Sequence, residues 1–180
     1  IWTQKPLDKS QLVVFYTHLQ PFRVILADFP KYFNKNLIAE EINNLFSNLK
    51  QTYQLYLIPA FWPDQPEYVY GVLDDSRRIY DAVTLWGSTT IVEFNQTISY
   101  SKYVNKTANY FETWSNITSD FGVAFVPLIC PGYNNTIYYI MGIRDWWAIV
   151  TRDPEGFSEV YLLATNYSTS IQYGIAIYME

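Results

Sequence analysis

The sequence predicts an α/β fold of parallel βα units, arranged as a partial or reduced (β/α) barrel of the TIM type. Several short apolar runs are continuous, which is typical of parallel strands buried on both faces. Segments with a helical apolar period lie between these runs. A closed eight-stranded barrel normally needs about 250 residues, so the chain forms either a partial or reduced barrel or an open sheet. We therefore expect residues 1–180 to form a single α/β domain, which could be the C-terminal part of a larger barrel.

The first half of the chain contains two repeats of a strand followed by a helix. Residues 11–17 are predicted to form a strand, and a helix over residues 36–50 follows with Asn36 as its N-cap. Residues 55–61 form the next predicted strand, and Pro66 begins a second helix. The inward face of the first helix is predicted to contain Ile38, Ile42, Leu45, Phe46 and Leu49. The second helix would bury Tyr68, Val69, Val72, Leu73 and Ile79.

The second half begins with a short strand over residues 81–86. The cleanest helical period of the chain follows over residues 99–121, and Gly122 is well placed to end that helix. Residues 123–130 are predicted as a buried strand. The apolar face of the helix contains Tyr103, Thr107, Tyr110, Phe111, Trp114, Ile117 and Phe121.

Three further segments complete the expected fold. A short aromatic segment occupies residues 145–150, and residues 160–165 are predicted to form another strand. Residues 171–179 are predicted as a last core strand, or alternatively as a strand donated to a neighbouring molecule.

Composition and charge exclude several classes of function. The net charge is -5 and the basic residues are scattered, so nucleic acid is not an expected partner. No apolar stretch is long enough to span a bilayer, and the chain begins at Ile1 without an apolar leader. His18 and Cys130 are the only histidine and cysteine, so we expect no metal site, no cofactor and a buried, inert thiol.

Five N-glycosylation acceptor triplets point to an exported protein, where chance predicts roughly 1.7. All five lie in the second half of the chain, so we expect the first half to pack on another domain or subunit. The alternative for each triplet is that Asn and Thr simply occupy turns and helix caps. The predicted location is extracellular or at the cell surface. The acceptor residues are Asn95, Asn105, Asn116, Asn134 and Asn166.

An ordered series of short motifs extends over residues 55–177. The segment 80–86 is followed by a predicted helix, then by 125–128 with the turn 131–135, and last by 162–166. In this order and spacing the chain resembles the barrel of the endo-mannosidase and endo-mannanase group of glycoside hydrolases. The resemblance implies that the Pro-Gly-Tyr turn lines a sugar cleft. It also implies a late strand that ends in an Asn followed by catalytic acids.

The sequence departs from that family pattern after Asn166. Residues 167–170 contain no acid, and the next carboxylate is Glu180. Glycoside hydrolysis normally needs two carboxyl groups held about 5 to 10 Å apart. The site is therefore either degenerate or rebuilt from other acids, and catalytic activity is left open.

Candidate site residues are those that follow the predicted strands, because functional residues of a barrel lie at the carboxyl ends of its strands. Trp62 and Trp86 are candidates to stack on sugar rings, and Tyr133 is a candidate hydrogen-bond donor. The alternative for each Trp is that it closes the top of the core. Asp64 and Glu93 are the candidate acid and base, although Asp64 also suits a turn cap.

Two functions from different classes fit these features. The first is a secreted, N-glycosylated domain that binds or processes carbohydrate, favoured by the aromatic residues and the resemblance. The second is a structural or adhesive surface protein, such as a subunit of an envelope layer or filament, favoured by the dense acceptor triplets and the missing acids. The expected partner is accordingly a carbohydrate or a neighbouring surface protein.

Overall fold

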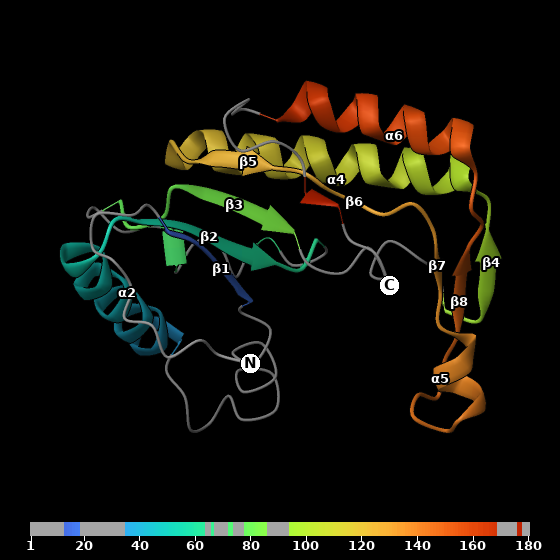
Figure 1. The fold of residues 1–180 in the computed structure, drawn as a ribbon, viewed down its shortest axis with the longest axis horizontal. Helices are drawn as coiled ribbons and strands as arrows, with labels where there is room; N and C mark the ends of the chain where they lie inside the picture. Colours follow the sequence, from blue (N-terminus) through green and yellow to red (C-terminus); the bar gives the residue numbers. More distant parts are fainter. Residues whose placement is uncertain are drawn as a thin grey trace.

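The computed structural model describes residues 13–18, 35–63, 66, 72–73, 78–85, 94–168 and 176–177. For residues 13–18, 35–38 and 176–177 the description covers the backbone. The central feature is a four-stranded sheet in the order β1-β2-β3-β5, and all its strands are parallel (Figure 1). The strands are β1 (Val13–His18), β2 (Leu55–Phe61), β3 (Ala82–Leu85) and β5 (Ala124–Val126).

The parallel strands follow one another in space as they do in sequence. Beyond Pro127 the chain continues as β6 (Leu128–Ile129), which pairs in parallel with β9 (Ala176–Ile177). A doubly wound sheet reverses its strand order at a switch point, whereas a (β/α) barrel keeps the sequence order throughout. The structure is therefore mixed α/β with parallel strands in sequence order, and within the described residues the sheet does not close into a barrel.

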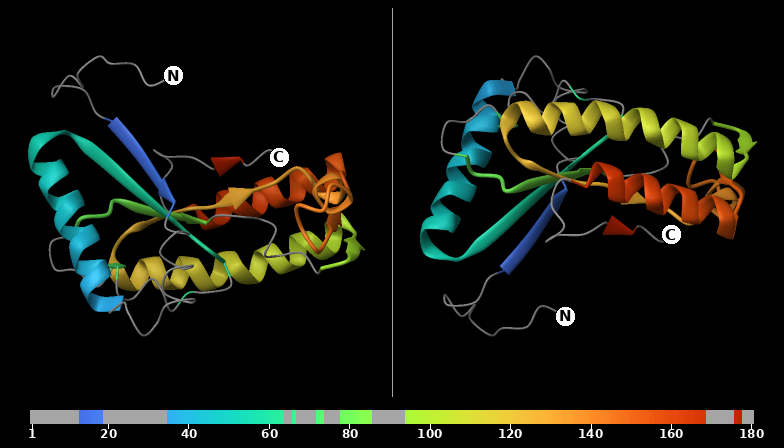
Figure 2. Two further views of the ribbon diagram at one scale, coloured as in Figure 1. Left: turned by 90° about the horizontal axis from the view of Figure 1, so that it is seen from below. Right: turned by 90° about the horizontal axis from the view of Figure 1, so that it is seen from above.

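Among the described residues, three long helices lie in connections between parallel strands. Helix α2 (Lys35–Thr52) lies between β1 and β2, α4 (Tyr100–Phe121) between β3 and β5, and α6 (Pro154–Tyr167) between β6 and β9. Helices α4 and α6 pack side by side, while α2 lies at the far end of the molecule (Figures 1 and 2). No helix of the described residues is long and apolar enough to cross a membrane.

A second, smaller sheet lies at the end of the molecule opposite α2. Its order is β4-β8-β7, formed by β4 (Gln96–Ile98), β8 (Ala148–Val150) and β7 (Tyr133–Asn134). Strand β4 is parallel to β8, and β7 is antiparallel to it. The short helix α5 (Thr136–Ile140) connects β7 to β8 and extends beyond the sheet (Figure 1).

The main core lies between the parallel sheet and α4. Successive side chains of a strand point to opposite faces, so Leu57, Val83 and Phe125 join the core shared with the helices. Phe125 contacts Phe111 of α4 edge to face at 5.8 Å between ring centroids. A smaller cluster occupies the other face of the sheet and contains Tyr56, Ile58, Ala82 and Val126.

Most of the predicted elements are confirmed where the structure describes them. Strand β2 coincides with residues 55–61, and β1 covers 13–18 in place of 11–17. Helix α4 begins after Ser99, whose hydroxyl accepts a hydrogen bond from Lys102 N–H. It ends at Gly122, which adopts the left-handed conformation with φ of 65° that a glycine tolerates without strain.

Other segments refine the predictions. The predicted strand 123–130 is interrupted at Pro127 into β5 and β6, while residues 148–150 of the aromatic segment form β8. Strand β9 pairs with β6 of its own chain, which supports the core-strand alternative for the final segment. The predicted helix that begins at Pro66 lies mostly outside the described residues. Within α2, Leu45 is 57% exposed and does not belong to the buried face that the sequence predicted.

The predicted strand over residues 160–165 is wrong, because this segment lies inside α6. Asp153 caps the helix by accepting a hydrogen bond from Glu155 N–H, and Pro154 occupies the first turn. Val160 and Ala164, one helical turn apart, are fully buried. A short apolar run does not distinguish a strand from a buried helical face, and here the capping signal at Asp153 decides.

Candidate functional site

The carboxyl ends of the parallel strands meet at one edge of the sheet, which we call the carboxyl edge. In open parallel sheets and in barrels, ligands bind outside this edge. His18 ends β1, Trp62 directly follows β2, and Thr84 lies near the end of β3. In the ladder, Thr84 is opposite Ala60 of β2 on one side and opposite Val126 of β5 on the other.

The position of Trp62 is fixed from α4. The indole N–H of Trp114 donates a hydrogen bond of 2.9 Å to the carbonyl of Pro63, and the Trp114 ring stacks on Phe61 at 5.6 Å. Both contacts hold the chain where it leaves β2. Trp62 itself is half-buried, so part of its side chain faces solvent next to the carboxyl edge.

Thr84 provides a polar group on the face of the sheet that bears the smaller cluster with Ala82 and Val126. It alternates with Val83 and Leu85 and is 1% exposed. Its hydroxyl has no hydrogen-bond partner in the part of the chain that the structure describes. An unsatisfied buried hydroxyl costs about 1 to 3 kcal/mol, so a hydrogen-bond partner for Thr84 would stabilise the folded state.

The remaining predicted site residues are separated from this edge or lie outside the described residues. Asp64, Trp86 and Glu93 belong to the second group, and their assignments stay predictions. Tyr133 lies on β7 of the smaller sheet and is 3% exposed, with its hydroxyl 3.2 Å from the Arg144 guanidinium. The structure therefore positions Trp62 and Tyr133 on different sheets.

All five acceptor asparagines lie on the surface. Asn105 and Asn116 occupy α4, and Asn166 occupies α6 instead of following a strand as the resemblance implied. Asn95 lies in the turn before β4 with φ of 58°, a left-handed conformation that Asn adopts more readily than most residues. Asn134 lies on β7, and the side chain of each of the five is exposed.

The triplet at Asn134 has a defined local geometry. The Asn134 amide oxygen accepts hydrogen bonds from the backbone N–H of Thr136 at 3.0 Å and from the Thr136 hydroxyl at 2.7 Å. This is an Asx-type turn, in which the side chain replaces a backbone acceptor. The acceptor and the hydroxyl residue of this triplet are therefore in direct contact in the folded chain.

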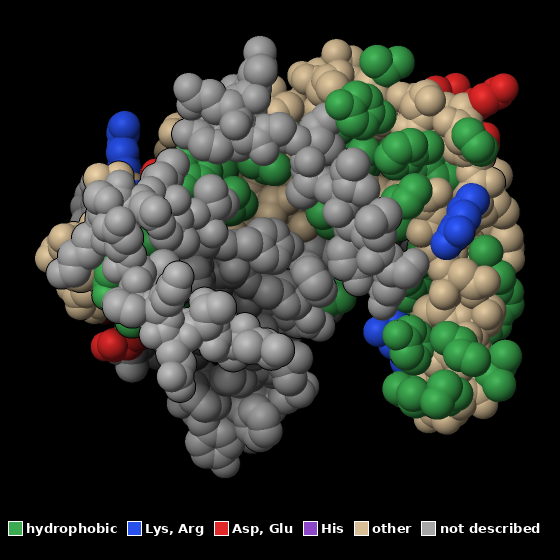
Figure 3. Space-filling view, viewed as in Figure 1, with side chains coloured by type: hydrophobic (Ala, Val, Ile, Leu, Met, Phe, Trp, Pro, Cys, Tyr) green, Lys and Arg blue, Asp and Glu red, His purple; other side chains and the backbone are tan. Residues whose placement is uncertain are grey.

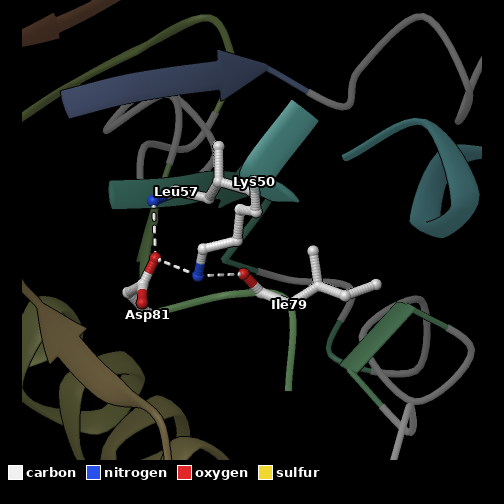
Figure 4. Close-up of polar contacts among 4 residues, drawn as sticks. All are labelled: Lys50, Leu57, Ile79 and Asp81. Carbon is white, nitrogen blue, oxygen red and sulfur yellow. Dashed lines mark hydrogen bonds and ion pairs between the residues drawn. The ribbon is translucent and has the colours of Figure 1, made fainter. Parts of the chain in front are cut away.

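A polar cluster at the opposite, amino edge of the sheet links α2 to the strands (Figure 4). The Lys50 ammonium lies 2.7 Å from the Asp81 carboxylate and also donates to the carbonyl of Ile79. The same carboxylate accepts a hydrogen bond of 2.8 Å from Leu57 N–H. Polar residues at this edge of a parallel sheet serve stability, so we assign the cluster a structural role.

Cys130 is buried, as the sequence predicted, and its thiol donates to the carbonyl of Gly132. The Tyr100 hydroxyl donates a hydrogen bond of 2.6 Å to the Cys130 carbonyl. Burial raises the pKa of Tyr100 well above its ordinary value, because the phenolate would lose its hydration. This phenol therefore stays protonated and acts as a structural donor.

Metal binding finds no support among the described residues, which contain no group of three or more His, Cys, Asp and Glu side chains suited to an ion. Comparisons with protein-family models, curated proteins and solved structures find nothing that matches this chain. The resemblance to the mannan-degrading barrels therefore stays a prediction that rests on the motifs alone.

Sequence reasoning missed the apolar surface around α5. Ile137, Ile140, Met141 and Ile143 are all exposed, and hydrophobic side chains gather there in Figure 3. One signal was available, because residues 121–143 contain no charged side chain. The sequence pattern predicts a buried strand over residues 123–130 and no element over residues 136–143, whereas an exposed apolar segment of this kind indicates an interaction site.

Proposed function

We propose that this chain is an exported, N-glycosylated domain that binds carbohydrate at the carboxyl edge of a partial (β/α) barrel. The exposure of all five acceptor asparagines carries the first part of the proposal, since a buried acceptor could not hold a glycan in the folded protein. The sequence order of the parallel strands supports the barrel-like architecture.

The carbohydrate part of the proposal rests on the groups at the carboxyl edge. Trp62 would offer an aromatic face to the apolar side of a sugar ring, and Thr84 would offer a hydroxyl to its polar groups. Hydrolysis would in addition need two carboxyl groups, for which Asp64 and Glu93 are the candidates. At this edge we therefore propose binding first, and a reaction is an extension of it.

A carbohydrate panel tests this claim. Manno-, gluco- and galacto-oligosaccharides would be titrated into the protein by calorimetry, with product release followed in parallel. We expect one class to bind and the variant Trp62→Ala to weaken that binding at least about tenfold, as loss of a stacking residue does. Trp147→Ala, which changes a Trp that directly precedes β8 and lies away from the parallel sheet, is the matched control. Silence across the panel would remove the carbohydrate function.

A structural or adhesive surface protein is the second candidate. The exposed apolar side chains around α5 favour it, because a soluble monomer rarely exposes such a patch unless the patch has a partner. This candidate predicts assembly at raised concentration, which size-exclusion chromatography with light scattering would detect. A protein that remains monomeric throughout would count against it.

A further inference from the structure

The segment that joins β7 to β8, residues 136–147, forms a projection at one end of the molecule (Figure 1). We call this segment the α5 tip. Five large apolar side chains of the tip are exposed, and Ile140 is the most exposed of them at 75%. The five are Ile137, Tyr139, Ile140, Met141 and Ile143.

The tip is held in one conformation by its base. Asn135 is fully buried, its side-chain oxygen accepts a hydrogen bond of 2.6 Å from Ala148 N–H, and its backbone N–H donates to the Ala148 carbonyl. At the far end, Gly142 adopts a left-handed φ of 69° and its N–H donates to Tyr139. The apolar side chains are therefore displayed by an ordered turn.

The tip also contains aromatic and cationic groups that contact one another. The Arg144 guanidinium lies 4.9 Å from the ring centre of Trp146 and 5.5 Å from that of Tyr138. Trp146 in turn packs against Phe94, which precedes β4, with 4.7 Å between ring centres. Arg144 also donates to the Tyr133 hydroxyl, and it makes no ion pair with any residue that the structure describes.

We propose that the α5 tip is a lipid-binding element that inserts its apolar side chains into the surface of a bilayer. The tip combines the kinds of side chain that a membrane interface accommodates. Uncharged Ile and Met side chains would enter the acyl region, and Tyr and Trp side chains would lie at the level of the headgroups, where they are enriched in membrane proteins. Arg144 would then meet a lipid phosphate, an anionic partner of the kind that the described residues do not give it.

Two observations favour a lipid surface over a second protein. The tip projects from the molecule, and a bilayer accepts a projecting apolar turn without a matching pocket (Figures 1 and 3). The accessible area of these five residues is on the order of 600 Å². A standard protein interface buries more than this on each partner. A membrane anchor of this size binds reversibly.

Vesicle flotation with the full glycosylated chain tests the proposal. We expect the protein to float with vesicles of phosphatidylcholine mixed with phosphatidylglycerol. Ile140→Asp should lower the bound fraction at least about tenfold, because a carboxylate is strongly disfavoured in the acyl region. The matched control is Leu162→Asp, which makes the same change at an apolar residue of α6 that is 63% exposed. Circular dichroism would verify that both variants fold.

Two further readouts separate insertion from simple adhesion. Trp fluorescence should shift to shorter wavelength on binding, and brominated lipids should quench it less in Trp146→Phe. Arg144→Gln should weaken binding to the anionic vesicles by about fivefold and change binding to pure phosphatidylcholine less.

Three results would overturn the proposal. One is a protein that does not float with either kind of vesicle. Another is equal loss of flotation in Ile140→Asp and Leu162→Asp, or loss in neither. The third is a protein that does not bind vesicles but forms a dimer by light scattering, with Ile140→Asp dissociating that dimer. The tip would then bind a second copy of the chain.

Discussion

Apolar side chains are buried around the parallel sheet and exposed at the α5 tip. In the sheet region the apolar residues are buried, and the Lys50–Asp81 pair satisfies polar groups at the amino edge. In the tip, hydrogen bonds between Asn135 and Ala148 hold the base, while Ile140 and its neighbours face solvent.

The difference indicates that the sheet region provides stability and that the tip serves binding. Burial of apolar surface is the main favourable term in folding, so the sheet region accounts for stability. The exposed side chains of the tip contribute little to it, and their retention on an ordered turn points to binding. If so, substitutions should lose stability in the sheet region and leave it nearly unchanged in the tip.

The largest expected effect is that of Trp114→Ala. Trp114 is fully buried, stacks on Phe61 and donates to the Pro63 carbonyl. Loss of the ring should lower the free energy of unfolding by about 3 to 5 kcal/mol, because it leaves a cavity in the main core. Chemical denaturation measures this value. Trp114→Phe keeps an aromatic ring and should lose less; equal stability of Trp114→Ala and the unchanged protein would refute the assigned core.

Asp81→Ala should have the next largest effect. The carboxylate accepts from Leu57 N–H and pairs with Lys50, so the change leaves a backbone donor unsatisfied and removes the ion-pair partner of the Lys50 ammonium. We expect a loss of about 1 to 3 kcal/mol in the free energy of unfolding. Asp81→Asn retains an acceptor for Leu57 and should lose less. If Asp81→Ala lowered the free energy of unfolding no more than Asp81→Asn does, the hydrogen bond to Leu57 would not contribute to stability.

Tyr100→Phe should cost about 1 kcal/mol, since it removes one buried hydrogen bond to the Cys130 carbonyl. The phenol also predicts a pH dependence. The folded state holds the phenolic proton more tightly than the unfolded chain, so its contribution is fully present below the ordinary pKa of 10.0 and decreases as the pH rises above it. Thermal unfolding between neutral and alkaline pH should show a shallower decline in Tyr100→Phe. An identical decline in both proteins would contradict this role.

The smallest expected effect is that of Ile140→Asp. Its side chain lies mostly in solvent, so the free energy of unfolding should change by less than about 0.5 kcal/mol. Denaturation under the same conditions as for Trp114→Ala makes the comparison direct. A loss of several kcal/mol would show that the tip belongs to the core and would remove the contrast between the two regions.

The sequence predicts an element well where its apolar pattern and its end signals indicate the same structure. Helix α4 combines an apolar period, a Ser cap and a terminal Gly, and β2 is a continuous apolar run between polar segments. Residues 160–165 were misassigned because apolar composition outweighed the cap at Asp153. Leu45 and Ile140 were beyond such reasoning, because their exposure depends on which elements pack against them in three dimensions.

The candidate site was predictable only in part. The position of Trp62 followed from the end of β2, but Thr84 was not predicted, since its importance comes from the neighbours Ala60 and Val126 across the sheet. Tyr133 followed an apolar run, yet that run leads into the smaller sheet, where its hydroxyl meets Arg144. Pairing between strands distant in sequence is not encoded in local periodicity.

Site-resolved glycopeptide mapping of protein from its native source tests the central claim, that this is an exported glycoprotein, most directly. The account predicts glycans on exposed acceptors, including Asn105 and Asn116 on the outer side of α4, and an unmodified carboxyl edge around Trp62. Bare asparagines at all five positions would contradict it, because exposed acceptors in an exported protein meet the requirement for modification.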